Sequence, residues 1–253
     1  MKLDIFGLTD KGLVRNKNED AFVIADDKEK FDIEKMGVLL AVADGMGGHP
    51  LGEVASRIAC EEILKYYQKE FSEEITPAQL IKHLTNTVFN VHAKIKIQST
   101  QDLLRVNMGT TLSVMVIYKQ KGLIVHVGDS RIYRLREGEL VKLTKDHTMA
   151  QKLFELGQID EDDSYENPLS HMLTQALGVE LNQPFVKEVD IKPKDVFLLC
   201  SDGLYNMVPK EEIKKELEKD LSSKDICENL ISLAIKGGGK DNITVIVAKI
   251  EDI

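Results

Sequence analysis

Short apolar runs, separated by polar and glycine-containing segments, make up much of this 253-residue chain. Runs of this kind are typical of β-strands. The pattern predicts about ten strands, at residues 3–9, 21–26, 37–43, 110–118, 123–127, 131–135, 140–143, 185–189, 196–200 and 243–250.

Helical periodicity appears between these groups of strands. From residue 52 to residue 70, apolar residues recur near the 3.6-residue period of an α-helix. A second helix is expected to start after Thr76, because Thr76 as N-cap, Pro77 at the first helical position and Gln79 form a capping box. Its buried face should consist of Leu80, Leu84, Val88, Val91 and Ile95. Two further helices are expected at about 210–218 and 223–236.

The separation of strands from helices favours an α+β fold over alternating βαβ units. No repeat, low-complexity stretch or linker interrupts the sequence, so we expect a single domain over residues 1–253. The mixed polar segment at about 145–178 breaks the strand pattern and is expected to be a surface insertion.

Composition narrows the class of protein. The chain has 33 basic and 42 acidic residues, and its formal net charge of −9 argues against a general binder of nucleic acids or anionic membranes. Its apolar runs fall far short of the ~18 residues of a membrane span, and Asp4 stands where a signal peptide would be apolar. The three cysteines are odd in number and widely spaced. These features indicate a cytoplasmic protein in which Cys200 is a buried core thiol.

Acidic residues stand directly before or after predicted strands. They are Glu19, Asp20, Asp44, Asp129, Asp202 and Asp241. A single Asp-Gly after a strand is most simply a turn. If several such carboxylates converge on one site, however, they repel one another unless cations neutralise them.

Hard divalent cations with oxygen ligands, Mg²⁺ or Mn²⁺, are the natural partners of such a cluster. Gly45 suits this site, because a residue without Cβ lets its backbone carbonyl turn toward an ion. Two ions bridged by one carboxylate would hold a hydroxide ready for in-line attack on phosphorus. Arg15, four residues before Glu19, is a candidate for binding phosphate oxygens, although a lone arginine in a loop is more often simply solvated.

Other chemistries fit the sequence less well. A cysteine-dependent phosphatase needs an arginine six residues after its nucleophile, and those positions hold Tyr66, Asn206 and Leu233. Segment 45–50 imitates a dinucleotide-binding loop, but Pro50 replaces the last glycine of GxGxxG and Asp44 would face the pyrophosphate. No group of histidines and cysteines has the spacing of a zinc site.

The acids lie within a series of short motifs: TDKGLVRNKNED at 9–20, DGMGGH at 44–49, GTT at 109–111, GDSR at 128–131, SDGL at 201–204 and DNIT at 241–244. Each motif alone is weak, but the ordered set is specific and extends from about residue 5 to residue 250. The series resembles the metal-dependent type 2C (PPM) serine/threonine protein phosphatases, most closely their compact bacterial branch.

The resemblance implies a four-layer α-β-β-α sandwich with a metal cluster at one end, between two antiparallel sheets. It implies that Asp44 bridges two Mn²⁺ or Mg²⁺ ions and that Asp202 and Asp241 complete the first of them. Asp129 would hold a third, weaker ion, which it would share with Asp202.

The other predicted site residues also follow from the resemblance. The Gly45 carbonyl, Glu19 and Asp20 would serve the second ion, partly through water, and Arg15 would bind the substrate phosphate. Residues 145–178 correspond to the mobile flap of the family, a substrate-selecting element.

The sequence departs from the family at the general acid and in the flap. Met46 stands where some eukaryotic relatives have a histidine, so His49 is the candidate general acid, with a metal-bound water as the alternative. The flap has His171 and Gln175 where relatives often have Asn and Arg, which leaves the flap contacts and the substrate preference open.

The implied function is hydrolysis of phosphoserine and phosphothreonine in proteins by a metal-bridging hydroxide, opposing a Ser/Thr kinase. A catalytically silent relative that binds phosphoproteins is the alternative, although the intact set of acids argues against it. A third possibility is a metal-dependent hydrolase of small phosphate esters. No exposed apolar stripe stands out in the sequence, which favours a monomer.

Overall fold

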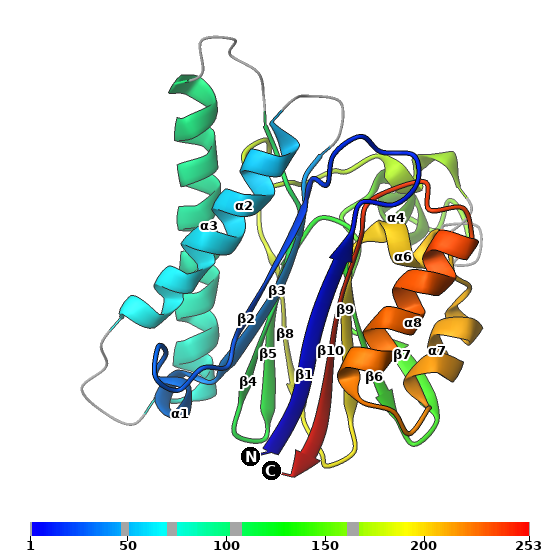
Figure 1. Cartoon of the computed structure of the whole chain (residues 1–253). Helices are drawn as coiled ribbons and strands as arrows, with labels where there is room; N and C mark the ends of the chain where they lie inside the picture. Colours follow the sequence, from blue (N-terminus) through cyan, green and yellow to red (C-terminus); the bar gives the residue numbers. More distant parts are fainter. Residues whose placement is uncertain (1, 47–50, 70–74, 102–107, 161–166, 253) are drawn as a thin grey trace.

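The computed structural model describes residues 2–46, 51–69, 75–101, 108–160 and 167–252. Within them, two five-stranded antiparallel sheets stack face to face (Figure 1). Sheet A runs in the order β1 (Lys2–Asp10), β10 (Ile243–Asp252), β9 (Val196–Cys200), β6 (Arg131–Arg136) and β7 (Glu139–Lys142). Sheet B runs in the order β2 (Asp20–Ala25), β3 (Val38–Asp44), β4 (Leu112–Tyr118), β5 (Lys121–Val127) and β8 (Phe185–Asp190). The ten predicted strands are confirmed, with ends shifted by at most two residues.

Helices cover the outer face of each sheet (Figure 1). The helix expected at 52–70 is α2 (Gly52–Ile63) followed by the 3₁₀ turn η1 (Leu64–Gln68), and both pack with α3 (Pro77–Gln101) on sheet B. On sheet A, α7 (Lys210–Leu217) and α8 (Ser223–Lys236) play the same part. The four-layer α-β-β-α prediction is therefore confirmed.

Strand β3 illustrates why its sequence is a continuous apolar run. Successive side chains of a strand point to opposite faces. Leu39, Ala41 and Ala43 pack in the core under α2 and α3, whereas Val38, Leu40 and Val42 pack in the core between the two sheets. Both faces of the strand are buried, so apolar residues are needed at every position.

Helix α3 has the predicted N-terminus and the predicted buried face. The Gln79 amide donates to Thr76 Oγ1 at 3.3 Å, and the Thr76 amide donates to Gln79 Oε1 at 2.9 Å. The five predicted apolar residues of this face are at most 1% exposed. Burial of each such side chain stabilises the fold by roughly 1.5–3 kcal/mol.

The segment predicted to be an insertion, 145–178, contains two short elements among its described residues, α4 (Met149–Glu155) and η2 (Pro168–His171). The Thr148 hydroxyl caps α4 by accepting from the Gln151 amide at 3.2 Å. The sequence did not predict α1 (Ile33–Met36) or α6 (Asp202–Tyr205), because a four-residue helix is too short to show a 3.6-residue period.

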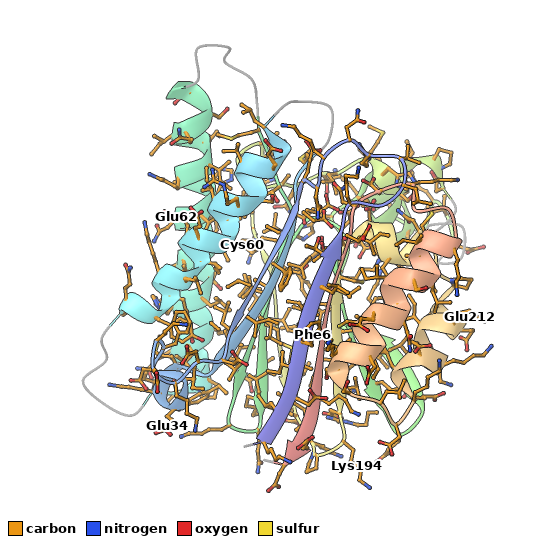
Figure 2. The ribbon with its side chains drawn as sticks, in the orientation of Figure 1. Phe6, Glu34, Cys60, Glu62, Lys194 and Glu212 are labelled. Carbon is orange, nitrogen blue, oxygen red and sulfur yellow. The ribbon has the colours of Figure 1, made fainter. Side chains whose placement is uncertain are left out.

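The three thiols are buried, including Cys60 on α2, which is labelled in Figure 2. Burial raises the pKa of Cys60, Cys200 and Cys227 to about 12, so none is a ready nucleophile. The prediction that Cys200 is a core thiol is confirmed. None of the helices in the described part of the chain is long and apolar enough to cross a membrane.

Candidate metal centre

A cavity of about 500 Å³ opens at the end of the sandwich where β3, β5 and β9 end and β10 begins. Seven of the nine predicted site residues lie on its wall: Arg15, Glu19, Asp44, Gly45, Asp129, Asp202 and Asp241. Met46, Thr111, His171 and Leu173 complete the wall. The eighth residue, Asp20, lies behind this wall, and the ninth, His49, falls outside the described residues. The fold thus gathers acids that are up to 222 positions apart, from Glu19 to Asp241.

Asp44 is held by the start of the next strand in sheet B. Its backbone amide donates to Thr111 Oγ1 at 2.9 Å, and its carbonyl accepts from the Thr111 amide at 2.8 Å and the Thr110 hydroxyl at 2.9 Å. Because its main chain is fixed on both sides, the Asp44 carboxylate is aimed by rigid backbone into the cavity.

Asp20 is not on the cavity wall but lies opposite Asp44, which is, in the pairing of β2 with β3. Its Oδ2 accepts from the Ser201 and Thr244 hydroxyls, each at 2.7 Å. Its Oδ1 is buried and has no hydrogen-bond partner among the described residues. Burial raises the pKa of Asp20 to about 7, because the charged form loses its hydration.

Asn242 fastens the N-terminal loop to the metal centre. Its amide nitrogen donates to the Lys11 and Lys17 carbonyls, both at 2.9 Å, and its Oδ1 accepts from the Glu19 amide at 2.8 Å. Gly12 lies in this loop with φ +74°, and a Cβ there would stand 2.3 Å from the Asp241 carbonyl oxygen. Only glycine permits this close approach of the loop.

Arg15 projects from the same loop and is about half-exposed. Its guanidinium donates to Asp241 Oδ2 at 2.6 Å, and this hydrogen bond raises the pKa of Arg15. The predicted phosphate-binding arginine therefore lies on the cavity wall with a carboxylate as its partner.

Gly45 is confined by backbone on both sides. A Cβ at this position would stand 2.4 Å from the Gly52 carbonyl oxygen and 2.6 Å from that of Glu19. The Gly45 amide also donates to the Glu19 carbonyl at 3.1 Å. Any side chain here would push the loop after β3 away from Glu19, so the site requires glycine at this position.

Burial and mutual repulsion both disfavour the ionised acids of the cavity. Burial raises the pKa of Asp44, Asp129 and Asp202, and neighbouring carboxylates raise it further. For Asp44 these neighbours include both of the other two acids. Burial also raises the pKa of Glu19. The cluster is therefore costly to keep ionised without a counter-charge.

The donor set fits hard divalent cations. Among the described residues, no three acidic, histidine or cysteine side chains are arranged to hold a metal ion as they stand. Five acids nevertheless line one cavity, and a buried carboxylate oxygen of Asp20 behind them has no hydrogen-bond partner among the described residues. Oxygen donors of this kind are the ligands that Mg²⁺ and Mn²⁺ prefer, and a bound cation would relieve their repulsion.

The chain that forms the acid cavity has known relatives. The family model for protein phosphatase 2C matches residues 16–230. The chain belongs to the protein phosphatase 2C family. A serine/threonine phosphatase stp of Listeria innocua is 35% identical over 244 residues, which cover 95% of this chain and 93% of that protein.

Solved structures of this family match the whole chain. The Stp1 phosphatase of Staphylococcus aureus has a TM-score of 0.89 and 30% identity, with 100% of this chain and 96% of that chain covered. The catalytic domain of the phosphatase PstP, solved with two manganese ions, has a TM-score of 0.81 and 35% identity, with 99% of both chains covered. The prediction of a metal-dependent serine/threonine protein phosphatase of the bacterial type is thereby confirmed.

Several residues that position the acids have no predicted role. They are Thr110, Thr111, Ser201, Asn242 and Thr244. Ser201 and Asn242 stand next to Asp202 and Asp241, and all five residues lie within the motifs quoted above, which was the available signal. Their partners lie far away in sequence, so the contacts themselves could not be predicted from spacing.

Proposed function

We propose that this chain binds two divalent ions in the acid cavity and uses them to remove phosphate from phosphoserine and phosphothreonine in proteins. The observation that carries the proposal is the convergence of five mutually repelling carboxylates on a single cavity in a protein phosphatase 2C fold. A cluster whose ionised form is this unfavourable is suited to an ion and has no evident structural use.

Asp44 would lie between the two ions, with Asp202 and Asp241 on the first and the Gly45 carbonyl, Glu19 and Asp20 on the second. Two ions so held would supply a water of lowered pKa and offset negative charge on the phosphate. The PstP structure with two manganese ions supports this number.

A third, weaker ion would bind at Asp129 and share Asp202. Support comes from the raised pKa of Asp129, to which burial contributes most and the charge of Asp202 next. An ion between the two carboxylates would remove this repulsion.

Arg15 would bind the phosphate oxygens of the substrate. Its guanidinium suits them, because it offers several N–H donors in one plane. In the structure it donates to Asp241, so substrate binding would exchange one anionic partner for another. His49 would donate a proton to the leaving serine or threonine oxygen, with a water molecule as the alternative donor.

The remaining assignments concern the whole chain. Residues 1–253 would form one catalytic domain, with 145–178 as a flap that selects substrates. The protein would act in the cytoplasm as a monomer and would oppose a Ser/Thr kinase. The three buried free thiols are consistent with a reducing compartment.

Hydrolysis of a phosphothreonine peptide tests the proposed function. The purified protein is assayed with Mn²⁺ and with the metal chelated, beside Asp202→Ala and the exposed control Asp220→Ala. We expect activity only with metal, a loss of about 10³-fold or more in Asp202→Ala, and wild-type turnover in Asp220→Ala.

Three results would contradict the proposal. Near-normal turnover in a folded Asp202→Ala variant would refute the metal assignment. Inactivity of the folded, metal-loaded wild-type protein would favour a silent phosphoprotein-binding relative. Equal rates on nucleotides and phosphopeptides would favour a hydrolase of small phosphate esters.

A further inference from the structure

A second cavity, of about 480 Å³, adjoins the metal centre and shares His171 with it. Its wall is formed by β6, the end of β7, η2, α6 and the start of α7. In Figure 1 these elements lie together on the α7 and α8 side of sheet A. We call it the basic cavity, because the charged side chains on its described wall are Arg131, Lys142 and Lys210, and none there is acidic.

Arg131 is held in place by three different contacts. It donates to Asp146 Oδ2 at 2.7 Å and to the Tyr133 hydroxyl at 3.2 Å, and its guanidinium lies 3.5 Å from the centre of the Tyr205 ring. The residue is only 8% exposed. A cation fixed in this way is pre-organised, so little side-chain entropy is lost when it meets an anion.

Among the described residues, the wall of the basic cavity carries three cations and no acid. Asp146 accepts from both Arg131 and Lys142, the latter at 3.2 Å, so one carboxylate is shared by two cations. Lys210 adds a third positive charge at the start of α7. The acids of the same helix turn do not enter the cavity, since Glu211 and Glu212 are exposed and Glu212, labelled in Figure 2, pairs with Lys215.

We propose that the basic cavity binds an anionic side chain of the phosphoprotein substrate, a carboxylate or a second phosphate, near the residue whose phosphate is removed. The proposal rests on the proposed function, because the shared wall residue His171 places the basic cavity beside the catalytic centre. The chain as a whole carries a net charge of −9 and the adjoining cavity is acidic, so three cations gathered here are a local exception that suits an anion. Phosphorylated or acidic sequences would then be preferred over neutral ones.

Paired phosphothreonine peptides test this inference. In each pair, one position at a fixed offset from the phosphothreonine is Glu in one peptide and Gln in the other, and the offset is varied. A parallel series has phosphoserine or serine at that position, which distinguishes a phosphate from a carboxylate as the preferred anion. We expect the wild-type protein to show about a tenfold preference in kcat/KM for the anionic member at one offset, mainly through KM.

Lys210→Glu should reduce this preference to less than about twofold, since it reverses one charge of the cavity. Lys215→Glu makes the same charge change on the same helix outside the cavity and should retain the preference. No preference at any offset, an undiminished preference in Lys210→Glu, or an equal loss in both variants would overturn the inference.

Binding without turnover separates this inference from the proposed function. Fluorescence anisotropy of the unphosphorylated Glu and Gln peptides on the metal-loaded protein gives the same comparison. A Glu preference that disappears in Lys210→Glu supports the basic cavity even if no peptide is hydrolysed, and an equal affinity for both peptides contradicts it. Hydrolysis of every peptide with no charge preference would support the proposed phosphatase activity and contradict the binding of an anion in the basic cavity.

Discussion

The two neighbouring cavities carry opposite charge, and they differ in how that charge is balanced. In the basic cavity the chain supplies its own counter-charge, because Asp146 lies against both Arg131 and Lys142. Burial alone would raise the pKa of Asp146, but these two cations hold it below its ordinary value. In the acid cavity, burial and neighbouring carboxylates raise the pKa of Asp44 and Asp202.

Asp146 thus stabilises Arg131 and Lys142 without any ligand, and Lys210 leaves the described wall of this cavity positive, whereas the acids of the other cavity depend on a bound cation. Arg15 is the only lysine or arginine on the described wall of the acid cavity, and it faces five carboxylates. The repulsion that remains costs stability, and such a cost is expected where function requires the residues.

Asp44→Asn should remove activity while it stabilises the metal-free fold. The amide keeps the shape of the side chain but cannot repel the other carboxylates or hold two cations. We expect turnover of a phosphothreonine peptide to fall about 10³-fold or more and the Tm of the metal-free protein to rise. Activity assays and thermal unfolding with a chelator measure both; a lower Tm in the variant would contradict the repulsion argument.

Asp146→Ala should have the opposite effect on stability. It leaves Arg131 buried without its carboxylate, and loss of one partner of a buried pair costs about 3–5 kcal/mol. Urea unfolding of the metal-free protein measures the loss, with the exposed Asp220→Ala as control. A cost below about 1 kcal/mol would show that the basic cavity does not depend on an internal counter-charge.

The two cavities could not be predicted equally well from the sequence. The acids of the metal centre stand at the ends of apolar strands and within ordered motifs, so both their identity and their convergence could be predicted. The basic cavity is assembled from Arg131, Lys142, Tyr205 and Lys210, which stand on four separate elements. No period or motif links these residues, because their proximity is created by the packing of α6 and α7 against sheet A.

Within the metal centre, too, long-range contacts could not be predicted from the sequence. The hydroxyls of Ser201 and Thr244 donate to Asp20 across 181 and 224 positions of sequence. Spacing along a chain gives information about one strand or helix, whereas these contacts depend on how sheet A stacks on sheet B. The fold class and the acid set were therefore predictable, and the side chains that hold Asp20 were not.

His126 should make the fold sensitive to acid, because it is fully buried within β5, next to the last residue of the strand. The Ser113 hydroxyl donates to the Ser130 carbonyl at 2.9 Å, so it accepts from His126 Nδ1 at 2.8 Å. Nε2 is then an unprotonated nitrogen without a hydrogen-bond partner in the described part of the chain. Burial, aided by the nearby His147, lowers the pKa of His126 from 6.5 to about 3.

A proton on His126 therefore favours the unfolded chain. The contribution of neutral His126 to the free energy of unfolding is complete above pH 6.5 and is lost progressively as the pH falls toward 3. Between pH 7 and pH 5 the wild-type protein should lose about 2 kcal/mol more than His126→Gln does. Urea unfolding at both pH values measures this difference. Asp20 and the other raised acids change stability in the opposite direction, so only the difference between the two proteins isolates His126; equal losses would contradict the assignment.

Asp129 lies where the two cavities meet, and its replacement should produce the smallest effect. Its carboxylate lines the acid cavity, while its carbonyl accepts from the hydroxyl of Tyr205, whose ring covers Arg131. If it holds only a third, weaker ion, Asp129→Ala should raise the Mn²⁺ concentration for half-maximal activity by about tenfold and leave the rate at saturating metal within a few-fold.

Tyr205→Phe distinguishes the carboxylate of Asp129 from its backbone contact. This variant removes the hydrogen bond to the Asp129 carbonyl but keeps the aromatic ring over Arg131. We expect it to shift the Mn²⁺ requirement much less than Asp129→Ala, because the carboxylate remains. An equal shift in both variants would mean that Asp129 acts by positioning the loop after β5, and an unchanged requirement in Asp129→Ala would reject the third ion. A shift confined to Asp129→Ala would mean that the metal centre includes the Asp129 carboxylate but not Tyr205, which lines only the basic cavity.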